Sequence, residues 1–282
     1  MKKIIETIFG FILSLFKKKT ENGDCPDCED RASCQTTDKN KKYALIVGME
    51  TSKWGACSGS DKDSDTMKGM ISNYVDSSHI VKLNNKQATK SAVVKALNEQ
   101  IAKVPEDGLF IFTYSGHGGQ MDKGTSKDET DGQDEFLCLY DDYLIDNDLW
   151  TIFNKCKGRV FVIFDCCHSS TMFRLPSEPI DEELDDSENR LPLDVPFFAK
   201  YENVRSSLRM FVISGCGEET VSWGDAIQGG VLTSSLKRAF NKCLNYREWW
   251  NSTRSDNAFK KVKQIPIATN VGGFDLNAKI FN

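Results

Sequence analysis

From residue 42 onward, short apolar runs alternate with segments in which apolar residues recur at helical spacing. The run at 43–47 is continuous and ends at Gly48, as expected of a strand that is buried on both faces. Several similar runs follow it. The predicted strands, in chain order, are 43–47, 79–83, 109–114, 159–164, 208–213 and 265–268.

Helical spacing occupies most of the chain between these strands. Met67, Met70 and Ile71 recur at core spacing, and Thr89 is placed to cap the next helix. The predicted helices are 63–74, 89–103, 146–155, 231–244 and 255–263. Strands that alternate with helices predict one α/β domain, 42–282, with a mostly parallel central sheet of about six strands flanked by helices. Ligand sites in such sheets form beyond the carboxyl ends of the strands.

The first 41 residues differ from the rest. Residues 1–19 hold an apolar run with lysines at both ends, which is too short to span a bilayer and contains Glu6. Its polar positions leave a broad apolar face, which indicates a helix lying in a membrane interface. Docking on a partner and a secretory signal are the alternatives. Residues 20–41 are predicted to be a polar linker, in which Cys25, Cys28 and Cys34 are incidental thiols rather than half of a zinc site.

Composition and charge exclude some classes of protein. The chain is 39% hydrophobic and 27% charged, which is ordinary for a globular protein, and its net charge of −5 gives no nucleic-acid footprint. Its ten cysteines are spread over 282 residues, which is too long for a disulfide-stapled miniprotein. We therefore expect buried free thiols in a reducing compartment, and a cytoplasmic protein that residues 1–19 can attach to a membrane surface.

Two predicted strands end in residues that suit nucleophilic chemistry. The strand at 109–114 continues into SGHG, with the histidine at His117, and the strand at 159–164 continues into DCCHS, with Cys167 before the histidine. A nearby imidazole can lower the pKa of a thiol or take its proton. Glycines beside His117 let a substrate approach backbone N–H groups closely. His79 lies at a strand start, away from these motifs, and is expected to be structural.

The two motifs, in this order and about fifty residues apart, resemble the histidine and cysteine motifs of the metacaspases within the caspase-like clan. The resemblance covers residues 42–281. It implies a caspase-like fold and a cysteine endopeptidase in which Cys167 attacks the peptide bond and His117 handles the proton. It also implies that the backbone N–H groups of Gly118 and Cys167 bind the oxyanion, while Cys166 occupies a variable position.

The same resemblance implies a substrate preference. Asp63 and Asp165, together with Ser115, match the positions that line the S1 pocket of the family and select arginine or lysine. A partly desolvated pair of carboxylates favours a cation and disfavours an acidic residue. The alternative for Asp63 is the capping of a helix N-terminus. The expected partners are protein or peptide substrates with a basic P1 residue, and the family analogy predicts a monomer.

We expect calcium to act as an activator and not to take part in the reaction. The acidic stretches 128–135 and 146–148 resemble family elements that bind Ca²⁺, with Asp131, Asp146 and Asp148 as the implied ligands. A solvated acidic loop is the alternative, since Arg174 stands where calcium-dependent relatives can supply another acid. The long connection 171–206 matches the region of self-cleavage in the family, and a surface insertion is its alternative.

Two other functions stay open. One is a clostripain-type or legumain-type protease of the same clan, which would differ in the residue after which it cleaves. The other is a catalytically silent scaffold with the caspase fold, recruited to membranes by residues 1–19. The presence of both His117 and Cys167 favours an enzyme.

Overall fold

The computed structural model describes residues 38–122, 133–166, 207–216 and 222–282, all of which belong to the unit Asp38–Asn282. The predicted amphipathic segment 1–19 and the linker cysteines lie outside the described residues, as do the whole connection 171–206 and its expected cleavage points. Among the helices in these described ranges, none combines the length and the apolar character that crossing a membrane requires.

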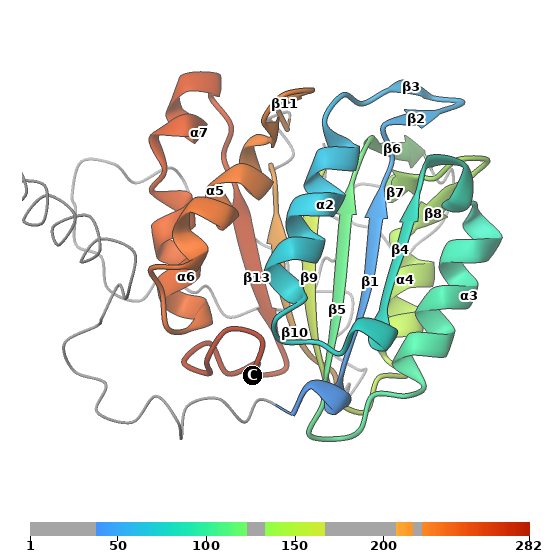
Figure 1. Cartoon of the computed structure of the whole chain (residues 1–282). Helices are drawn as coiled ribbons and strands as arrows, with labels where there is room; N and C mark the ends of the chain where they lie inside the picture. Colours follow the sequence, from blue (N-terminus) through green and yellow to red (C-terminus); the bar gives the residue numbers. More distant parts are fainter. Residues whose placement is uncertain (1–37, 123–132, 167–206, 217–221) are drawn as a thin grey trace, which may run out of the picture. The chain divides into compact units, whose positions relative to one another are not determined.

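A six-stranded sheet forms the centre of the unit (Figure 1). Its spatial order is β13-β10-β9-β5-β1-β4, and every neighbouring pair is parallel except β10 with β13. The predicted α/β fold with a mostly parallel sheet of six strands is confirmed. The strands are β1 (Lys42–Gly48), β4 (Ile80–Asn84), β5 (Leu109–Ser115), β9 (Arg159–Asp165), β10 (Arg209–Ser214) and β13 (Ile267–Val271).

The continuous apolar runs exist because the central strands are covered on both faces. In β1, Leu45 and Val47 pack into one hydrophobic cluster, whereas Ala44 and Ile46 pack into another on the opposite face. Successive side chains of a strand point to opposite faces, so a doubly covered strand needs apolar residues at every position.

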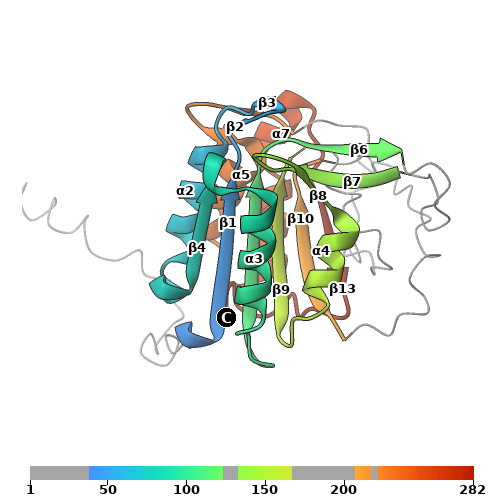
Figure 2. The same cartoon turned by 90° about the vertical axis from the view of Figure 1, so that its right-hand side faces the viewer.

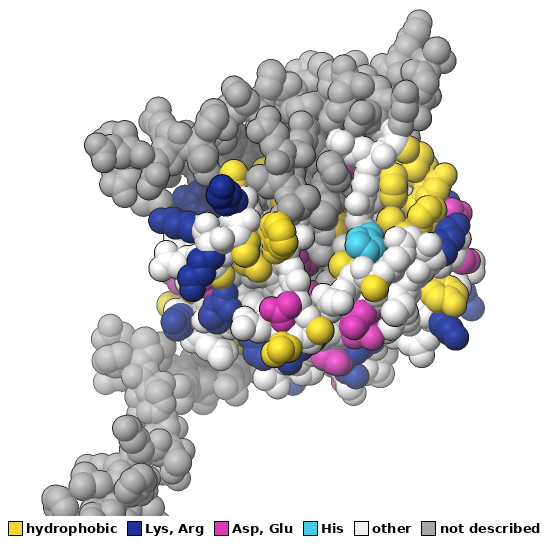
Figure 3. Space-filling model, turned by 90° about the horizontal axis from the view of Figure 1, so that it is seen from above, with side chains coloured by type: hydrophobic (Ala, Val, Ile, Leu, Met, Phe, Trp, Pro, Cys, Tyr) yellow, Lys and Arg dark blue, Asp and Glu magenta, His cyan; other side chains and the backbone are white. Residues whose placement is uncertain are grey.

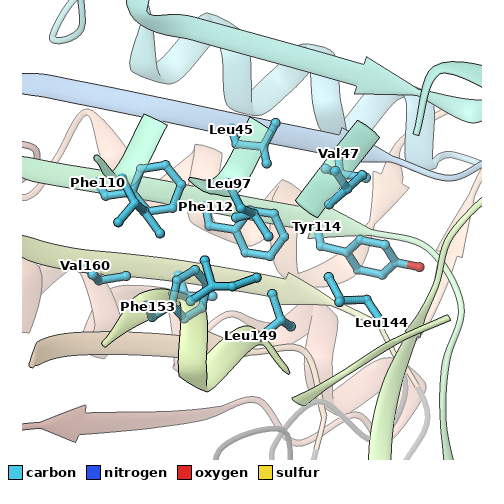
Figure 4. Packing of buried hydrophobic residues seen from close by; sticks show 14 of the residues in the cluster. Leu45, Val47, Leu97, Phe110, Phe112, Tyr114, Leu144, Leu149, Phe153 and Val160 are labelled. Carbon is cyan, nitrogen blue, oxygen red and sulfur yellow. The ribbon is translucent and has the colours of Figure 1, made fainter. Parts of the chain in front are cut away.

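Helices divide between the two faces of the sheet (Figures 1 and 2). Helices α3 (Lys90–Ile101) and α4 (Asp146–Phe153) cover one face, where Phe112 and Phe153 meet with ring centroids 5.8 Å apart (Figure 4). The opposite face carries α2 (Ser60–Ile71), α5 (Val231–Phe240), α6 (Tyr246–Arg254) and α7 (Asn257–Val262).

Helix α6 was not expected from the sequence, although its signal is visible there. Tyr246, Trp249 and Trp250 are buried at helical spacing, and the Asn245 side chain caps the helix by accepting from the Glu248 N–H. Helix α5 ends at Phe240 rather than at residue 244. Helix α2 both begins and ends three residues before the predicted range.

Small sheets and short 3₁₀ helices complete the described part of the unit. A three-stranded sheet has the order β6-β7-β8, and two hairpins pair β2 with β3 and β11 with β12. For the acidic stretch 128–135, the sequence indicated a calcium element with a solvated loop as the alternative, and its residues 133–135 belong to strand β7. These elements are β2 (Thr51–Ser52), β3 (Gly55–Ala56), β6 (Gly118–Asp122), β7 (Gln133–Cys138), β8 (Tyr143–Ile145), β11 (Gly224–Asp225), β12 (Gly229–Gly230) and the 3₁₀ helices Lys39–Lys41, Ser77–His79 and Asn85–Gln87.

Candidate active site

The carboxyl ends of β5 and β9 bring the two sequence motifs to one edge of the sheet. Ser115, the last residue of β5, stands opposite Asp165, the last residue of β9, in the parallel pairing of these strands. The Gly116 N–H also donates to the Asp165 carbonyl at 3.3 Å. His117 thus follows β5 by two positions, as Cys167 follows β9. Cys167 itself lies outside the described residues, and the described chain stops at the buried Cys166.

The backbone of His117 is fixed from two sides. Its carbonyl accepts the Cys138 N–H at 3.0 Å and lies 2.6 Å from the Tyr114 hydroxyl, which is also 2.7 Å from the Cys138 carbonyl. A side chain at Gly116 would overlap Tyr114 and Met49, so the residue before the histidine must be glycine for this path of the chain.

The His117 ring is held by the hairpin β2–β3. Its Nε2 lies 3.0 Å from the carbonyl oxygen of Ala56, and the side chain is partly exposed. A carbonyl oxygen can only accept a hydrogen bond, so this contact places the proton of a neutral imidazole on Nε2. Nδ1 is then the ring nitrogen that can take a proton from a nucleophile. No local pattern in the sequence indicated Ala56, because the contact is through its backbone.

Gly118, the expected oxyanion donor, begins β6 opposite Leu137 of β7. Residues in an antiparallel ladder alternate between pairs that exchange hydrogen bonds and pairs whose backbone groups point outward. The Cys138 N–H already donates to His117, so the next pair is of the outward type. The Gly118 N–H therefore points away from β7, where a ligand atom could accept it.

Two buried carboxylates lie at the same edge of the sheet. Asp63 is 2% exposed and Asp165 is 5% exposed. The Ser115 hydroxyl donates to Asp63 at 2.6 Å, so the three residues expected to line the S1 pocket are brought together. Helix α2 begins at Ser60 with Gly59 at its N-cap, which places Asp63 inside the helix rather than at its capping position.

Burial shifts the ionisation of both carboxyl groups. It raises the pKa of Asp63 to about 8, and the neighbouring Asp165 acts in the same direction, while hydrogen bonds from Ser115 and Gly230 oppose the shift. Burial also raises the pKa of Asp165, against the hydrogen bonds from Ser222 and Thr233. Two carboxylates that share a desolvated site resist ionising together, and a cation placed between them would remove that resistance.

The segment before α5 and the first turn of α5 supply donors that the sequence did not indicate. The Gly230 N–H donates to Asp63 at 2.8 Å. Asp165 accepts from the Ser222 hydroxyl at 2.7 Å and from both the N–H and the hydroxyl of Thr233, at 2.9 and 2.8 Å. These donors lie 57 to 167 positions from their acceptors, so no sequence pattern connects them.

Both residues of β12 must be glycine because the two carboxylates lie directly against the backbone there. A side chain at Gly230 would overlap the Asp165 carboxylate, and one at Gly229 would overlap that of Asp63. Gly229 also has a positive φ of 81°, which favours glycine independently. The consecutive glycines at the start of α5 were the one local signal that backbone approaches a functional group there.

The expected calcium ligands lie only partly within the described part of the chain. Asp146 is buried at the start of α4, Asp148 is exposed two positions later, and Asp131 lies outside the described residues. Among the described residues no three carboxylate, histidine or cysteine side chains gather to hold a metal ion. Because Asp131 lies outside the described residues, the three expected calcium ligands stay a prediction.

Seen from above, the edge of the sheet presents a histidine between hydrophobic side chains, with acidic side chains beside it (Figure 3). Trp223 is 51% exposed, so it belongs to the surface and not to the core. His79, which the sequence analysis expected to be structural, stacks on Tyr43 with ring centroids 4.2 Å apart. Of the cysteines in the described ranges, Cys57 and Cys243 are partly exposed, whereas Cys138, Cys156, Cys166 and Cys216 are buried, and all six lie outside disulfide bonds.

Comparisons with known proteins agree with this architecture. The family model of the Caspase domain matches residues 41–272. Metacaspase-1 of Candida albicans is 35% identical over 156 residues, which cover 48% of this chain and 35% of that protein. Metacaspase-1 of Ajellomyces capsulatus is 29% identical over 153 residues, which cover 48% of this chain and 42% of that protein. The matched part thus spans less than half the length of these relatives.

Solved structures show the same fold. Protein GSU0716 of Geobacter sulfurreducens superposes with a TM-score of 0.63 and 23% identity, over 86% of this chain and 98% of that one. Caspase-1 of Spodoptera frugiperda gives a TM-score of 0.51 and 13% identity, over 82% and 86% of the two chains. The chain therefore belongs to the caspase domain family, and metacaspases are among its relatives.

Proposed function

We propose that this protein is a cysteine endopeptidase that cleaves peptide bonds after arginine or lysine, with Cys167 as the nucleophile and His117 as the proton carrier. The observation that carries the proposal is the pair of buried carboxylates, Asp63 and Asp165, at the edge of the sheet where β5 continues to His117. A protease that is specific for basic residues needs negative charge of this kind beside its nucleophile.

The reaction follows from the chemistry of the two side chains. The Cys167 sulfur gives its proton to Nδ1 of His117 and attacks the scissile carbonyl, whose oxygen becomes negatively charged. The Gly118 N–H, which points away from β7, would donate to that oxygen. Collapse of the intermediate breaks the C–N bond while His117 returns the proton to the leaving amine, which leaves a thioester. Water then hydrolyses the thioester, giving the acid and restoring the thiol.

The preference for a basic residue rests on uncompensated charge. Among the described residues, the hydrogen-bond partners of the two carboxylates are all neutral, and the further charged group that acts on Asp63 is the acidic Glu50. An arginine or lysine side chain would supply the missing positive charge in a desolvated site, where charge-assisted hydrogen bonds are strong. An aspartate at P1 would instead bring a further carboxylate to a pair that already resists ionising together.

Fluorogenic peptides that differ only at P1 test the proposal. We expect turnover with arginine or lysine at P1 and little with asparagine or aspartate. Cys167→Ala and His117→Ala should abolish turnover, whereas Cys166→Ala, which removes the adjacent thiol, should retain it. Asp63→Asn and Asp165→Asn should raise KM by about tenfold or more for the basic substrates, because a hydrogen bond to a charged group is lost.

Other outcomes would assign a different function. Cleavage after asparagine or aspartate would indicate a legumain-type or caspase-type specificity. A folded wild-type protein without turnover on any of these peptides would indicate a silent scaffold. Loss of activity in Cys166→Ala with retention in Cys167→Ala would move the nucleophile by one position.

Calcium is proposed only as an activator, because the reaction above uses side chains of this chain alone. The same assay with EGTA and with added Ca²⁺ tests it. A rise in turnover with Ca²⁺ would support a regulatory site that includes residues outside the described ranges, such as Asp131. Mass spectrometry of the incubated protein tests self-cleavage after Arg174, Arg190, Lys200 or Arg205, all of which lie outside those ranges.

A further inference from the structure

Gln264 is a buried polar residue directly after α7, far in sequence from both motifs. The helix ends at Val262, and its C-cap residue Lys263 has a left-handed φ of 55°, after which the chain turns to Gln264. Gln264 is only 3% exposed. Burying a primary amide is costly unless its hydrogen bonds are made, so the partners of this side chain indicate its role.

The side-chain amide of Gln264 joins the two ends of the segment between β10 and β11. Nε2 donates to the Gly215 carbonyl at 2.6 Å, one residue beyond β10. Oε1 accepts the Trp223 N–H at 3.0 Å, one residue before β11. A third contact runs from Nε2 to the Ser222 hydroxyl oxygen at 3.3 Å. One side chain therefore holds both ends of the segment that leads to the donors of Asp63 and Asp165.

The chemistry of these partners fixes the orientation of the amide. A carbonyl can only accept and a backbone N–H can only donate, so the amide nitrogen must face Gly215 and the amide oxygen must face Trp223. Ser222 then receives a hydrogen bond from Nε2. Its single hydroxyl proton is left for Asp165, which lies 2.7 Å away.

The direction of that proton matters for the charge of Asp165. Burial raises the pKa of this carboxyl group, and the hydrogen bond from Ser222 is the largest influence that opposes burial. A carboxylate that accepts a hydrogen bond is stabilised in its charged form, which is the form that binds a cation. Gln264 therefore acts on the charge of Asp165 without touching it.

We propose that Gln264 is a positioning residue for the S1 pocket, which keeps Asp165 a cation acceptor by fixing the direction of the Ser222 hydroxyl. The inference rests on the proposed cleavage after basic residues. It deepens that proposal by naming a residue, outside the two motifs, on which the affinity for arginine or lysine depends.

Gln264→Glu is the sharpest test because it replaces the side-chain amide by a carboxyl group of nearly the same size. A carboxylate cannot donate to Gly215 or Ser222, and it competes with Asp165 for the hydroxyl proton of Ser222. We expect KM for an arginine peptide to rise about tenfold while kcat changes less than about twofold. Ser222→Ala removes the hydrogen bond from the Ser222 hydroxyl to Asp165 and should raise KM in the same way.

The double variant separates positioning from a general structural effect. If Gln264 acts through Ser222, Gln264→Glu should add little to KM once Ser222 is alanine, whereas independent structural effects would add. Gln100→Glu is the matched control, since Gln100 is also buried but lies on α3 at the opposite face of the sheet. It should lower the melting temperature without changing KM.

The pH dependence of KM gives a second reading. Carboxyl groups that act on this site from neighbouring elements are Asp63 of α2 and Glu50, which follows β1. Without the hydrogen bond from Ser222, Asp165 should ionise at higher pH. The decrease of KM with rising pH should therefore occur at higher pH in Gln264→Glu and in Ser222→Ala than in the wild type.

The possible results distinguish failure of the proposed function from failure of the role proposed for Gln264. Wild-type protein that does not cleave after arginine or lysine contradicts the proposed function. Active wild type with unchanged KM in Ser222→Ala, or with fully additive effects in the double variant, overturns the role of Gln264 alone. If Gln264→Glu does not fold, an unchanged KM in Ser222→Ala still overturns it, and a raised KM with a shifted pH profile supports it.

Discussion

The Ser115 hydroxyl donates a 2.6 Å hydrogen bond to the Asp63 carboxylate across 52 positions of the chain. Ser115 ends β5 beside the histidine motif, and Asp63 lies in the early turns of α2. The contact joins the helix that supplies one carboxylate to the strand that leads to His117. It also couples the charge of the pocket to the edge of the sheet where the proposed chemistry takes place.

Ser115→Ala tests this coupling. Removing the donor takes away a hydrogen bond that stabilises charged Asp63, so its pKa should rise further. We expect KM for arginine peptides to rise about threefold to tenfold, with a smaller effect on kcat, as measured by steady-state kinetics. Ser72→Ala, at the exposed C-terminal end of α2, is the control and should leave both constants unchanged. Equal losses in kcat and KM would contradict a role limited to the pocket.

The Asp63–Asp165 pair should make ligand binding depend on pH. The pKa of Asp63 is raised to about 8, so the pair loses a proton as pH rises from 6 to 8 and gains affinity for a cation. We expect a small guanidinium ligand such as agmatine to bind about tenfold more tightly at pH 8 than at pH 6, measured by calorimetry. Asp63→Asn should remove this dependence. A flat profile in the wild type would contradict the raised pKa.

The same pair should lower stability as pH rises. A carboxyl group whose pKa is raised on folding holds its proton in the folded state while the unfolded chain has already lost it, between about pH 4 and pH 8. The free energy of unfolding therefore falls across this window. We expect the melting temperature of the wild type to fall more steeply from pH 5 to pH 8 than that of Asp63→Asn. Parallel curves for the two proteins would refute this assignment.

Lys42 should destabilise the fold at neutral pH. It is 4% exposed, its Nζ has no hydrogen-bond partner among the described residues, and burial together with Arg159 lowers its pKa to about 8. A lysine with a lowered pKa costs stability that is regained as pH rises from about 8 toward its unfolded value. Lys42→Met should raise the free energy of unfolding at pH 7 by about 1–3 kcal/mol. The gain should shrink at pH 10, and a gain of constant size would point to packing.

Gly230 should tolerate no side chain. A methyl group there would overlap the Asp165 carboxylate, and the Gly230 N–H is a donor to Asp63. Gly230→Ala should therefore raise KM for basic substrates at least about tenfold. Gly69→Ala is the matched control, because nothing lies within 4 Å of its added methyl group on α2. That variant should keep KM and stabilise the helix by about 0.5–1 kcal/mol in urea unfolding. An unchanged KM in Gly230→Ala would mean that β12 can move away from the pocket.

The sequence by itself determined the central sheet and the edge that carries the motifs. Each central strand is covered on both faces, so its run of apolar residues is visible without any knowledge of its neighbours. The carboxyl ends of parallel strands share one edge, so strand assignment alone placed His117 beside the end of β9. The spacing of Tyr246, Trp249 and Trp250 also carried enough information to predict α6.

Tertiary structure alone decided the surroundings of those motifs. The Ala56 carbonyl holds the His117 ring through backbone atoms, which leave no trace in residue type. Ser222, Thr233 and Gln264 are common polar residues whose partners lie tens of positions away, so their roles arise only when β10, α5 and α7 pack around the end of β9. A sequence pattern records what a segment needs locally, whereas a hydrogen bond between distant segments depends on how those segments meet in space.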